Sequence, residues 1–271
     1  MKIYIITMDD PLKTNDFIKH IIRSRRQDII GLAMHNRGRL TISKKKSKTA
    51  YVFSLFLIMG SYSFLKNVLK VLLHKLKILL SSIYLTENPT ILNFAKGLGI
   101  PVKKIINPNN ESFIKYLTNI EVDLIINQSQ CIIKEKLLLV PNIGVINRHN
   151  ALLPRNRGRL TPFWVLYNQD NYTGVSIHFL DKEIDAGKII VQLKFPVTAR
   201  DNFNTIVEKN YHYANKAIIL ALEKLERHNY SLLDNDAKSA TYNSTPTLFH
   251  AFSFRKLRII NKLRSFKLKA V

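Results

Sequence analysis

Cysteine is nearly absent from this sequence, which has Cys131 alone among its 271 residues. A single cysteine excludes an intramolecular disulfide and is typical of a protein that works in a reducing compartment. The first ten residues hold one lysine and a short apolar stretch that ends at Asp9 and Asp10, a pattern that favours a first strand over a secretory signal. With 46% apolar residues, the chain can bury a proper core. We therefore expect a cytoplasmic globular protein.

Acidic residues are also scarce, with 19 Asp and Glu against 42 Lys and Arg, which gives a formal net charge of +23. No acidic residue occurs between Asp28 and Glu87, and the basic run from Arg255 to Lys269 has none either. Such an imbalance indicates the kind of partner and says little about the fold. Nucleic acid, anionic lipid and phosphorylated small substrates all fit it.

Long apolar runs are missing too, although residues 36–85 come close. The uncharged stretch from Ala50 to Leu65 contains Gly60 and falls short of the roughly 20 residues that a transmembrane helix needs. Leucines then recur at helical spacing with lysines between them. We expect one or two helices packed on the domain. The alternative is a basic amphipathic element on an anionic membrane or a partner, and a membrane span is the least favoured interpretation.

The rest of the chain alternates between strand and helix patterns, which predicts an α/β fold with a mostly parallel sheet. A basic loop is expected at 37–48, two paired strands at 173–180 and 188–197, and a long helix at 204–227. After residue 230 we expect loop with short strands. The last twenty residues are compatible with a helix that docks on the protein, binds a membrane or stays disordered. Further strands are predicted at 2–8, 29–34, 101–106, 122–127 and 144–147, and further helices at 13–25, 89–97, 110–119, 134–140 and 161–167.

Three polar side chains of the sequence suit acyl transfer to an amine. Asn147 ends a predicted strand and His149 follows two residues later, so both side chains leave the same side of an extended chain. Asp185 lies in the loop between the two later strands. An amide can hold a developing oxyanion, a histidine can move a proton, and a carboxylate can orient that histidine. Taken singly, each would be an ordinary strand-end, surface or turn residue, and only the combination favours a site.

A loop framed by Pro154 and Gly158 follows these residues and is rich in arginine. Because the planar guanidinium donates two hydrogen bonds side by side, arginine suits phosphate. We predict that the loop binds a phosphorylated acceptor. The predicted acceptor-binding residues are Arg155, Asn156, Arg157 and Arg159.

The chain resembles the folate-dependent formyltransferases, a family that includes glycinamide ribonucleotide transformylase, methionyl-tRNA formyltransferase and the sugar N-formyltransferases. The resemblance is strong over about residues 120–200 and weaker over 1–35 and 86–120. Three motifs carry it in the family order. They are Asn147-x-His149 with Leu152-Leu153-Pro154 and Arg157-Gly158, then Gly174 to Phe179, then Ile184-Asp185-Ala186-Gly187 with Lys188, Ile189, Ile190 and Gln192.

The resemblance implies a Rossmann-like catalytic domain over 1–229 that uses N10-formyltetrahydrofolate as formyl donor and no metal. Residues 36–85 would be a basic, apolar helical insertion, and 230–271 a short basic C-terminal extension. The family's catalytic asparagine, histidine and aspartate fall on Asn147, His149 and Asp185. Asn147 and protonated His149 would stabilise the oxyanion, while Asp185 would keep His149 charged and help to move the amine proton.

By the same resemblance, the folate would lie against two segments whose backbone reads the edge of the pterin. The implied folate-binding residues are Asn127, Gln128, Ser129, Gln130, Cys131, Ile132, Asp181 and Ile184. One position departs from the family, because many members have serine where this chain has Ala151. Any acceptor contact carried by that serine is missing here.

The resemblance leaves the acceptor amine open. A nucleotide-linked amino sugar of polysaccharide biosynthesis is favoured, because the Leu-Pro-x-Asn-Arg-Gly form at 153–158 is frequent in sugar N-formyltransferases. Its base would stack on Phe163, Trp164 or Tyr167, although Trp164 is equally suited to the core. The alternatives are methionyl-tRNA, glycinamide ribonucleotide, and water, which would make the protein a formyltetrahydrofolate hydrolase. A binding protein that kept the fold without catalysis is disfavoured by the intact triad.

Peripheral contact with the inner face of an anionic membrane is a further hypothesis for residues 51–85 and 251–271.

Overall fold

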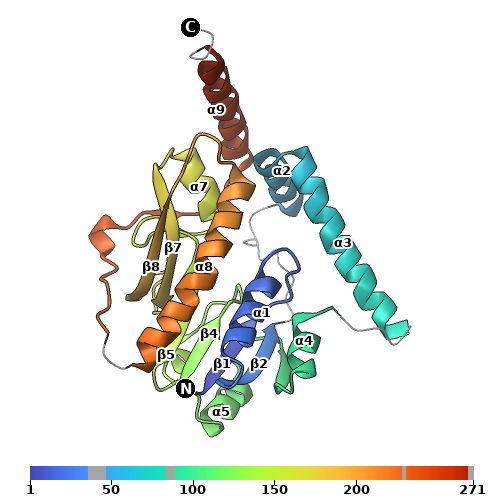
Figure 1. Cartoon of the computed structure of the whole chain (residues 1–271), viewed down its shortest axis with the longest axis vertical. Coiled ribbons are helices and arrows are strands. Elements are labelled where there is room, and N and C mark those ends of the chain that lie inside the picture. The colour runs from blue at the N-terminus through green and yellow to red at the C-terminus, as the bar shows by residue number, and fades with distance from the viewer. Residues whose placement is uncertain (36–46, 84–88, 228–229, 268–271) are drawn as a thin grey trace.

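A seven-stranded sheet with helices on both faces forms the centre of the protein (Figure 1). The computed structural model describes residues 1–35, 47–83, 89–227 and 230–267, and for 82–83 and 261–267 it describes the backbone only. Most of the basic loop predicted for 37–48 therefore lies outside the described residues. The strands are β1 (Ile3–Thr7), β2 (Ile29–His35), β3 (Val102–Ile105), β4 (Leu124–Asn127), β5 (Gly144–His149), β7 (Tyr172–Phe179) and β8 (Ile189–Pro196).

The strand order is β3-β2-β1-β4-β5-β7-β8, and the first five strands run parallel. β7 is antiparallel to β5, and β8 is antiparallel to β7. The central strands β1 and β4 are buried at every residue, as expected for parallel strands that are covered on both faces. The predicted α/β fold with a mostly parallel sheet is confirmed.

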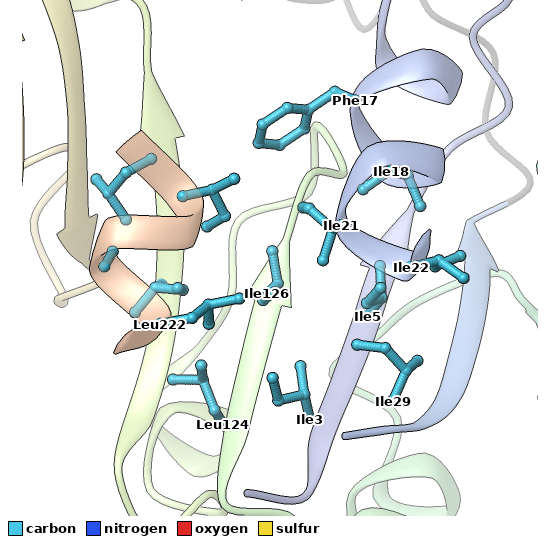
Figure 2. Packing of buried hydrophobic residues seen from close by; sticks show 14 of the residues in the cluster. Ile3, Ile5, Phe17, Ile18, Ile21, Ile22, Ile29, Leu124, Ile126 and Leu222 are labelled. Atoms are coloured by element: carbon cyan, nitrogen blue, oxygen red, sulfur yellow. The ribbon is translucent and has the colours of Figure 1, made fainter. Parts of the chain in front are cut away.

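Helices cover both faces of this sheet. Residues of α1, α4 and α8 join one core cluster with the strands, and residues of α5 and α6 join the cluster on the other face. Figure 2 shows Ile18, Ile21 and Ile22 of α1 packed over Ile3 and Ile5 of β1. The bounds of these helices are α1 (Thr14–Ser24), α4 (Ile91–Gly97), α5 (Glu111–Asn119), α6 (Glu135–Leu138) and α8 (Phe203–Glu226).

A third cluster joins the C-terminal segment to the rest of the protein. Phe163 and Trp164 of α7 (Thr161–Tyr167) pack with Ile58 of α2 (Lys48–Met59) and with Ala251 and Phe254 of α9 (Leu248–Lys267). The first part of the C-terminal helix is therefore docked, which was one of the three alternatives for it. The short elements before it are η1 (Ala237–Ser239) and β9 (Tyr242–Asn243), and β9 pairs in parallel with β6 (Arg157–Gly158).

Residues 48–83 form two helices, α2 and then α3 (Ser61–Ile83), with Gly60 between them. At Gly60, φ is +86°, a left-handed conformation that glycine adopts without steric cost. α3 extends away from the sheet domain (Figure 1), and its Lys70 and His74 contact Leu12 and Asp9 of the domain. Among the described residues, no helix is long and apolar enough to cross a membrane.

Candidate active site

β5 places Asn147 and His149 where the strand meets its two neighbours in the sheet. Asn147 lies opposite Asn127 of β4 on one side and His178 of β7 on the other, and His149 lies opposite Ser176. The predicted alternation is therefore observed. Ligand sites in open parallel sheets form at the carboxyl ends of strands, and β4 and β5 both end here.

Asp185 reaches the same point from the loop between β7 and β8, and hydrogen bonds fix its position. Its φ is +54°, a left-handed conformation that aspartate and asparagine tolerate better than most residues. The Gly158 amide donates to Asp185 Oδ2 over 2.9 Å. The Asn235 side-chain amide donates to the carbonyls of Asp185 and Gly187 over 2.8 and 2.9 Å. The carboxylate is thereby held against β5.

The His149 ring lies between two oxygen acceptors. Its Nε2 is 2.7 Å from the Asn156 carbonyl oxygen, and its Nδ1 is 3.5 Å from Asp185 Oδ2. The side chains of both His149 and Asp185 are about nine-tenths buried or more. A carbonyl oxygen cannot donate, so Nε2 carries a proton, and a second proton on Nδ1 would face the carboxylate. The ring can therefore donate toward both oxygens only when each nitrogen carries a proton.

Asn147 has its amide orientation set by a chain of polar contacts. Arg148 Nε donates to Gln128 Oε1 over 3.1 Å, and Gln128 Nε2 donates to Asn147 Oδ1 over 2.9 Å. Arg148 is held in turn by Asn150 and by the hydroxyl and ring of Tyr211. Because Asn147 Oδ1 accepts from Gln128, the Asn147 amide nitrogen is directed to donate elsewhere. Gln128, predicted to bind folate, therefore also orients Asn147.

His178 is a further residue of the site to which the sequence analysis assigned no role. Its side chain is fully buried, Nδ1 donates to the Phe179 carbonyl over 2.8 Å, and Nε2 lies 3.8 Å from Asp185 Oδ1. Nε2 has no hydrogen-bond partner in the described part of the chain. Burial, together with the neighbouring His149, lowers the pKa of His178 to about 4 despite the nearby carboxylate. Alternation along β7 puts His178 on the same face as Ser176, and the register of β7 with β5 places it opposite Asn147.

A neutral buried histidine makes stability depend on pH in a defined direction. The unfolded chain takes up the proton near pH 6.5 and the folded chain only near pH 4, so His178 destabilises the fold progressively as pH falls between these values. We expect His178→Asn, which keeps a donor toward the Phe179 carbonyl, to remove this pH-dependent loss of stability. The variant should cost stability at pH 7. From pH 7 to pH 5, the wild type should lose about 1–2 kcal/mol more unfolding free energy than the variant in urea titrations. Parallel losses would contradict the assignment.

The predicted folate-binding residues divide into buried and exposed members. Asn127 is buried, and its Oδ1 accepts from both the amide and the hydroxyl of Ser129. Cys131 Sγ lies 3.0 Å from His35 Nε2. Ile132 and Ile184 have exposed fractions of 70% and 49%. Gln130 and Asp181 lie on the same two loops, next to these residues.

The predicted acceptor-binding loop divides in the same way. Arg157 is buried and donates to the backbone and side-chain oxygens of Asn235. Asn156 is buried between Asp170 and Asn243. These two side chains therefore fasten the loop to residues 235–243, contrary to the expectation that they would face the acceptor. The side chains that face solvent are Arg155, which lies 4.0 Å from Asp170, and Arg159.

Two other sequence alternatives are resolved by burial. Phe163 and Trp164 are 0% and 8% exposed and pack against α9, and Trp164 donates to the Ser244 carbonyl, so they belong to the core. Ala151 is fully buried, and its carbonyl accepts from the Ser176 hydroxyl. In the described residues, no cluster of three or more His, Cys, Asp or Glu side chains could hold a metal.

Comparison with known proteins agrees with this α/β fold. Residues 95–222 match the model of the formyl transferase family. Methionyl-tRNA formyltransferase of Thermotoga maritima is 32% identical over 162 residues, which cover 58% of this chain and 52% of that protein. The bifunctional polymyxin resistance protein ArnA of Wigglesworthia glossinidia brevipalpis is 33% identical over 129 residues, 46% of this chain and 20% of that protein. The chain thus spans about half the length of the methionyl-tRNA formyltransferases that it matches.

Solved structures show the same fold at low sequence identity. A sugar N-formyltransferase from a Shewanella species superposes with a TM-score of 0.58 at 17% identity, over 90% of this chain and 77% of that chain. Phosphoribosylglycinamide formyltransferase from Streptococcus pneumoniae gives 0.56 at 15% identity, over 83% and 98%. The match of residues 95–222 to the formyl transferase family and the shared fold therefore agree with each other.

Proposed function

We propose that this protein transfers the formyl group of N10-formyltetrahydrofolate to the primary amine of a nucleotide-linked amino sugar. The observation that carries the proposal is the His149 ring, held between the Asn156 carbonyl and the Asp185 carboxylate beside Asn147. In the reacting state that we propose, both ring nitrogens of His149 carry a proton and each faces an oxygen acceptor. A cation beside an oriented amide donor is the arrangement that stabilises a developing oxyanion.

The chemistry follows from these contacts. The acceptor amine attacks the formyl carbon, and negative charge develops on the formyl oxygen. Asn147 Nδ2 and His149 Nε2–H donate to that oxygen, the latter after its hydrogen bond to the Asn156 carbonyl breaks. The attacking nitrogen loses a proton to Asp185, directly or through water, and Asp185 returns that proton by the same route to the folate N10 as the bond between the formyl carbon and N10 breaks. Hydrogen bonds of this kind often reach their final geometry only in the complex with substrate.

The donor assignment rests on the family and on the two loops beside Asn147 and Asp185. Ile132 and Ile184 are exposed apolar side chains that suit the flanks of a flat ring, and backbone groups of the 127–133 segment suit its polar edge. A related N-formyltransferase from Helicobacter canadensis, 16% identical, has been solved with folinic acid and dTDP-3-aminofucose. We carry the folate and the nucleotide-linked sugar to this chain as proposals.

For the acceptor, the supporting features are the two solvent-facing arginines of the 155–159 loop. Arg155 and Arg159 are suited to a pyrophosphate, whereas Asn156 and Arg157 shape the loop from within. A second candidate is methionyl-tRNA, which the names of the curated relatives and the net charge of +23 favour. The two candidates differ in the salt dependence that they predict, because tRNA would release many counterions on binding.

The test is formyl transfer by the purified full chain with N10-formyltetrahydrofolate and a panel of acceptors. The panel holds dTDP- and UDP-linked amino sugars, charged initiator tRNA, glycinamide ribonucleotide and a reaction without amine. We expect kcat/KM for one nucleotide-linked sugar to exceed the others by about 100-fold or more, with weak salt dependence. Formylation of tRNA but of none of the sugars, at a rate that falls steeply as the salt concentration rises, would establish the second candidate instead. Folate turnover without amine would identify a hydrolase.

A further inference from the structure

α3 presents an exposed apolar stripe that the formyl-transfer site does not use. Its apolar residues recur at the i, i+3, i+4 and i+7 positions that share one helix face, a stripe about a third of the circumference wide. Leu65 is 61% exposed and Leu79 is 58% exposed, near opposite ends of the helix. The members of this leucine stripe are Leu65, Val68, Leu69, Leu72, Leu73, Leu76, Leu79 and Leu80.

The opposite face of α3 is the one fastened to the protein. His74 Nε2 lies 2.7 Å from Asp9 Oδ2, and Lys70 Nζ donates to the Leu12 carbonyl over 3.3 Å. His74 is half a helical turn away from Leu72 and Leu76 on the helix circumference. The leucine stripe is therefore exposed on the side of α3 opposite these two contacts.

The charges that flank the stripe are all of one sign. Lys66, Lys75 and Lys77 are exposed on α3, and Lys70 lies on the same helix near the domain. No acidic residue occurs anywhere between Asp28 and Glu87. Two copies of α3 packed through their stripes would set lysines against lysines with no carboxylate to pair them. The surface instead complements a partner that is apolar within and anionic at its boundary.

The apolar surface continues onto α2 and α9. Phe53 is 46% exposed and Phe252 of α9 is 55% exposed, and their rings lie 6.3 Å apart. Beside them is an open apolar groove of about 500 Å³ with a lysine at its edge. It is lined by Lys48, Thr49, Val52, Phe53, Phe56 and Phe64.

We propose that α3, together with this groove, docks on the surface of an anionic lipid bilayer. The leucine stripe would enter the boundary between headgroups and acyl chains, and the lysines would extend to the lipid phosphates. The groove is suited to the acyl chain of a phospholipid, and the phosphate of that lipid would contact Lys48. No helix of the described residues can span a membrane, so the helix lies in the interface. The proposal is independent of the formyl acceptor.

The test is co-sedimentation of the full chain with phosphatidylcholine vesicles that contain or lack phosphatidylglycerol, without folate or acceptor. We expect binding to the anionic vesicles only, weakened by salt. Leu69→Gln, Leu72→Gln and Leu76→Gln combined should weaken binding about tenfold or more, because they remove the inserted surface. Lys66→Gln, Lys75→Gln and Lys77→Gln should each weaken it about fivefold. The matched control changes three exposed leucines elsewhere to glutamine, namely Leu98, Leu139 and Leu220, and should bind like the wild type.

Several outcomes would overturn the proposal. They are absence of binding at low salt, equal binding to neutral vesicles, and unchanged binding of the leucine-stripe variant. Analytical ultracentrifugation supplies a further outcome. The wild type could sediment as a dimer that does not bind vesicles, while the leucine-stripe variant sediments as a monomer. That result would make the stripe an interface between copies of this chain. Specific binding of an acidic protein, without binding to vesicles, would show that the partner of the stripe is a protein and not a bilayer.

Discussion

The His149→Ala variant is expected to lose about 10²–10⁴-fold in kcat/KM for formyl transfer, because it removes the proposed acid that meets the oxyanion. In the structure the His149 side chain joins the Asn156 carbonyl to the Asp185 carboxylate. Alanine supplies neither the positive charge nor the hydrogen-bond donor that the proposed mechanism places beside the oxyanion. The measurement is the steady-state rate with the acceptor identified by the panel. Asn147 and the rest of the fold remain, so KM should change less than kcat.

The control for this variant is His212→Ala, an exposed histidine on α8. It should keep wild-type rates, while circular dichroism and urea unfolding should show both variants folded. Because His149 is buried, some loss of stability is expected from its truncation. A folded His149→Ala variant that turns over at the wild-type rate would refute the proposed mechanism.

Asp185→Asn is expected to lower kcat about 10²–10⁴-fold while leaving the loop in place. Asparagine tolerates the left-handed conformation at φ +54°, and its amide oxygen can still accept from the Gly158 amide. What disappears is the negative charge that lies 3.5 Å from His149 Nδ1 and 3.8 Å from His178 Nε2. Without that charge, the His149 cation loses its counter-ion and the amine proton loses its acceptor.

Glu183→Gln is the matched control, since it removes an exposed carboxylate from the same loop. It should keep the wild-type rate, and the unfolding free energy of Asp185→Asn should stay close to that of the wild type. A large loss of stability without a loss of rate in the remaining folded protein would give Asp185 a structural role only. Equal rate losses in both variants would indicate a general effect of loop charge.

Much of the fold followed from local pattern. The helix predicted at 161–167 has those bounds in the structure, and the long helix predicted at 204–227 spans 203–226. Buried parallel strands are short apolar runs between helices, and such runs are legible in sequence because both faces must be covered. The same patterns gave the α/β class and the paired strands around Asp185.

The acceptor loop shows where pattern was insufficient. Arg155, Asn156, Arg157 and Arg159 look alike as polar residues of one loop, yet two of them are buried against residues 235–243. Their partners lie about 80 residues away in the chain, so no local rule places them. His178 was overlooked for a related reason, since its burial and its proximity to Asp185 depend on how β7 packs in the sheet.

By itself, the sequence determined the α/β fold and the triad of Asn147, His149 and Asp185 as candidates, because strand periodicity and motif order are properties of neighbouring residues. Only the tertiary structure decided which side chains share the site and which ones hold it together. It set the His149 ring between a carbonyl and a carboxylate, and it turned Arg157 inward. It also left the leucine stripe of α3 uncovered. These outcomes depend on which surfaces bury one another across long stretches of chain, and burial determines the charge states and contacts of polar groups.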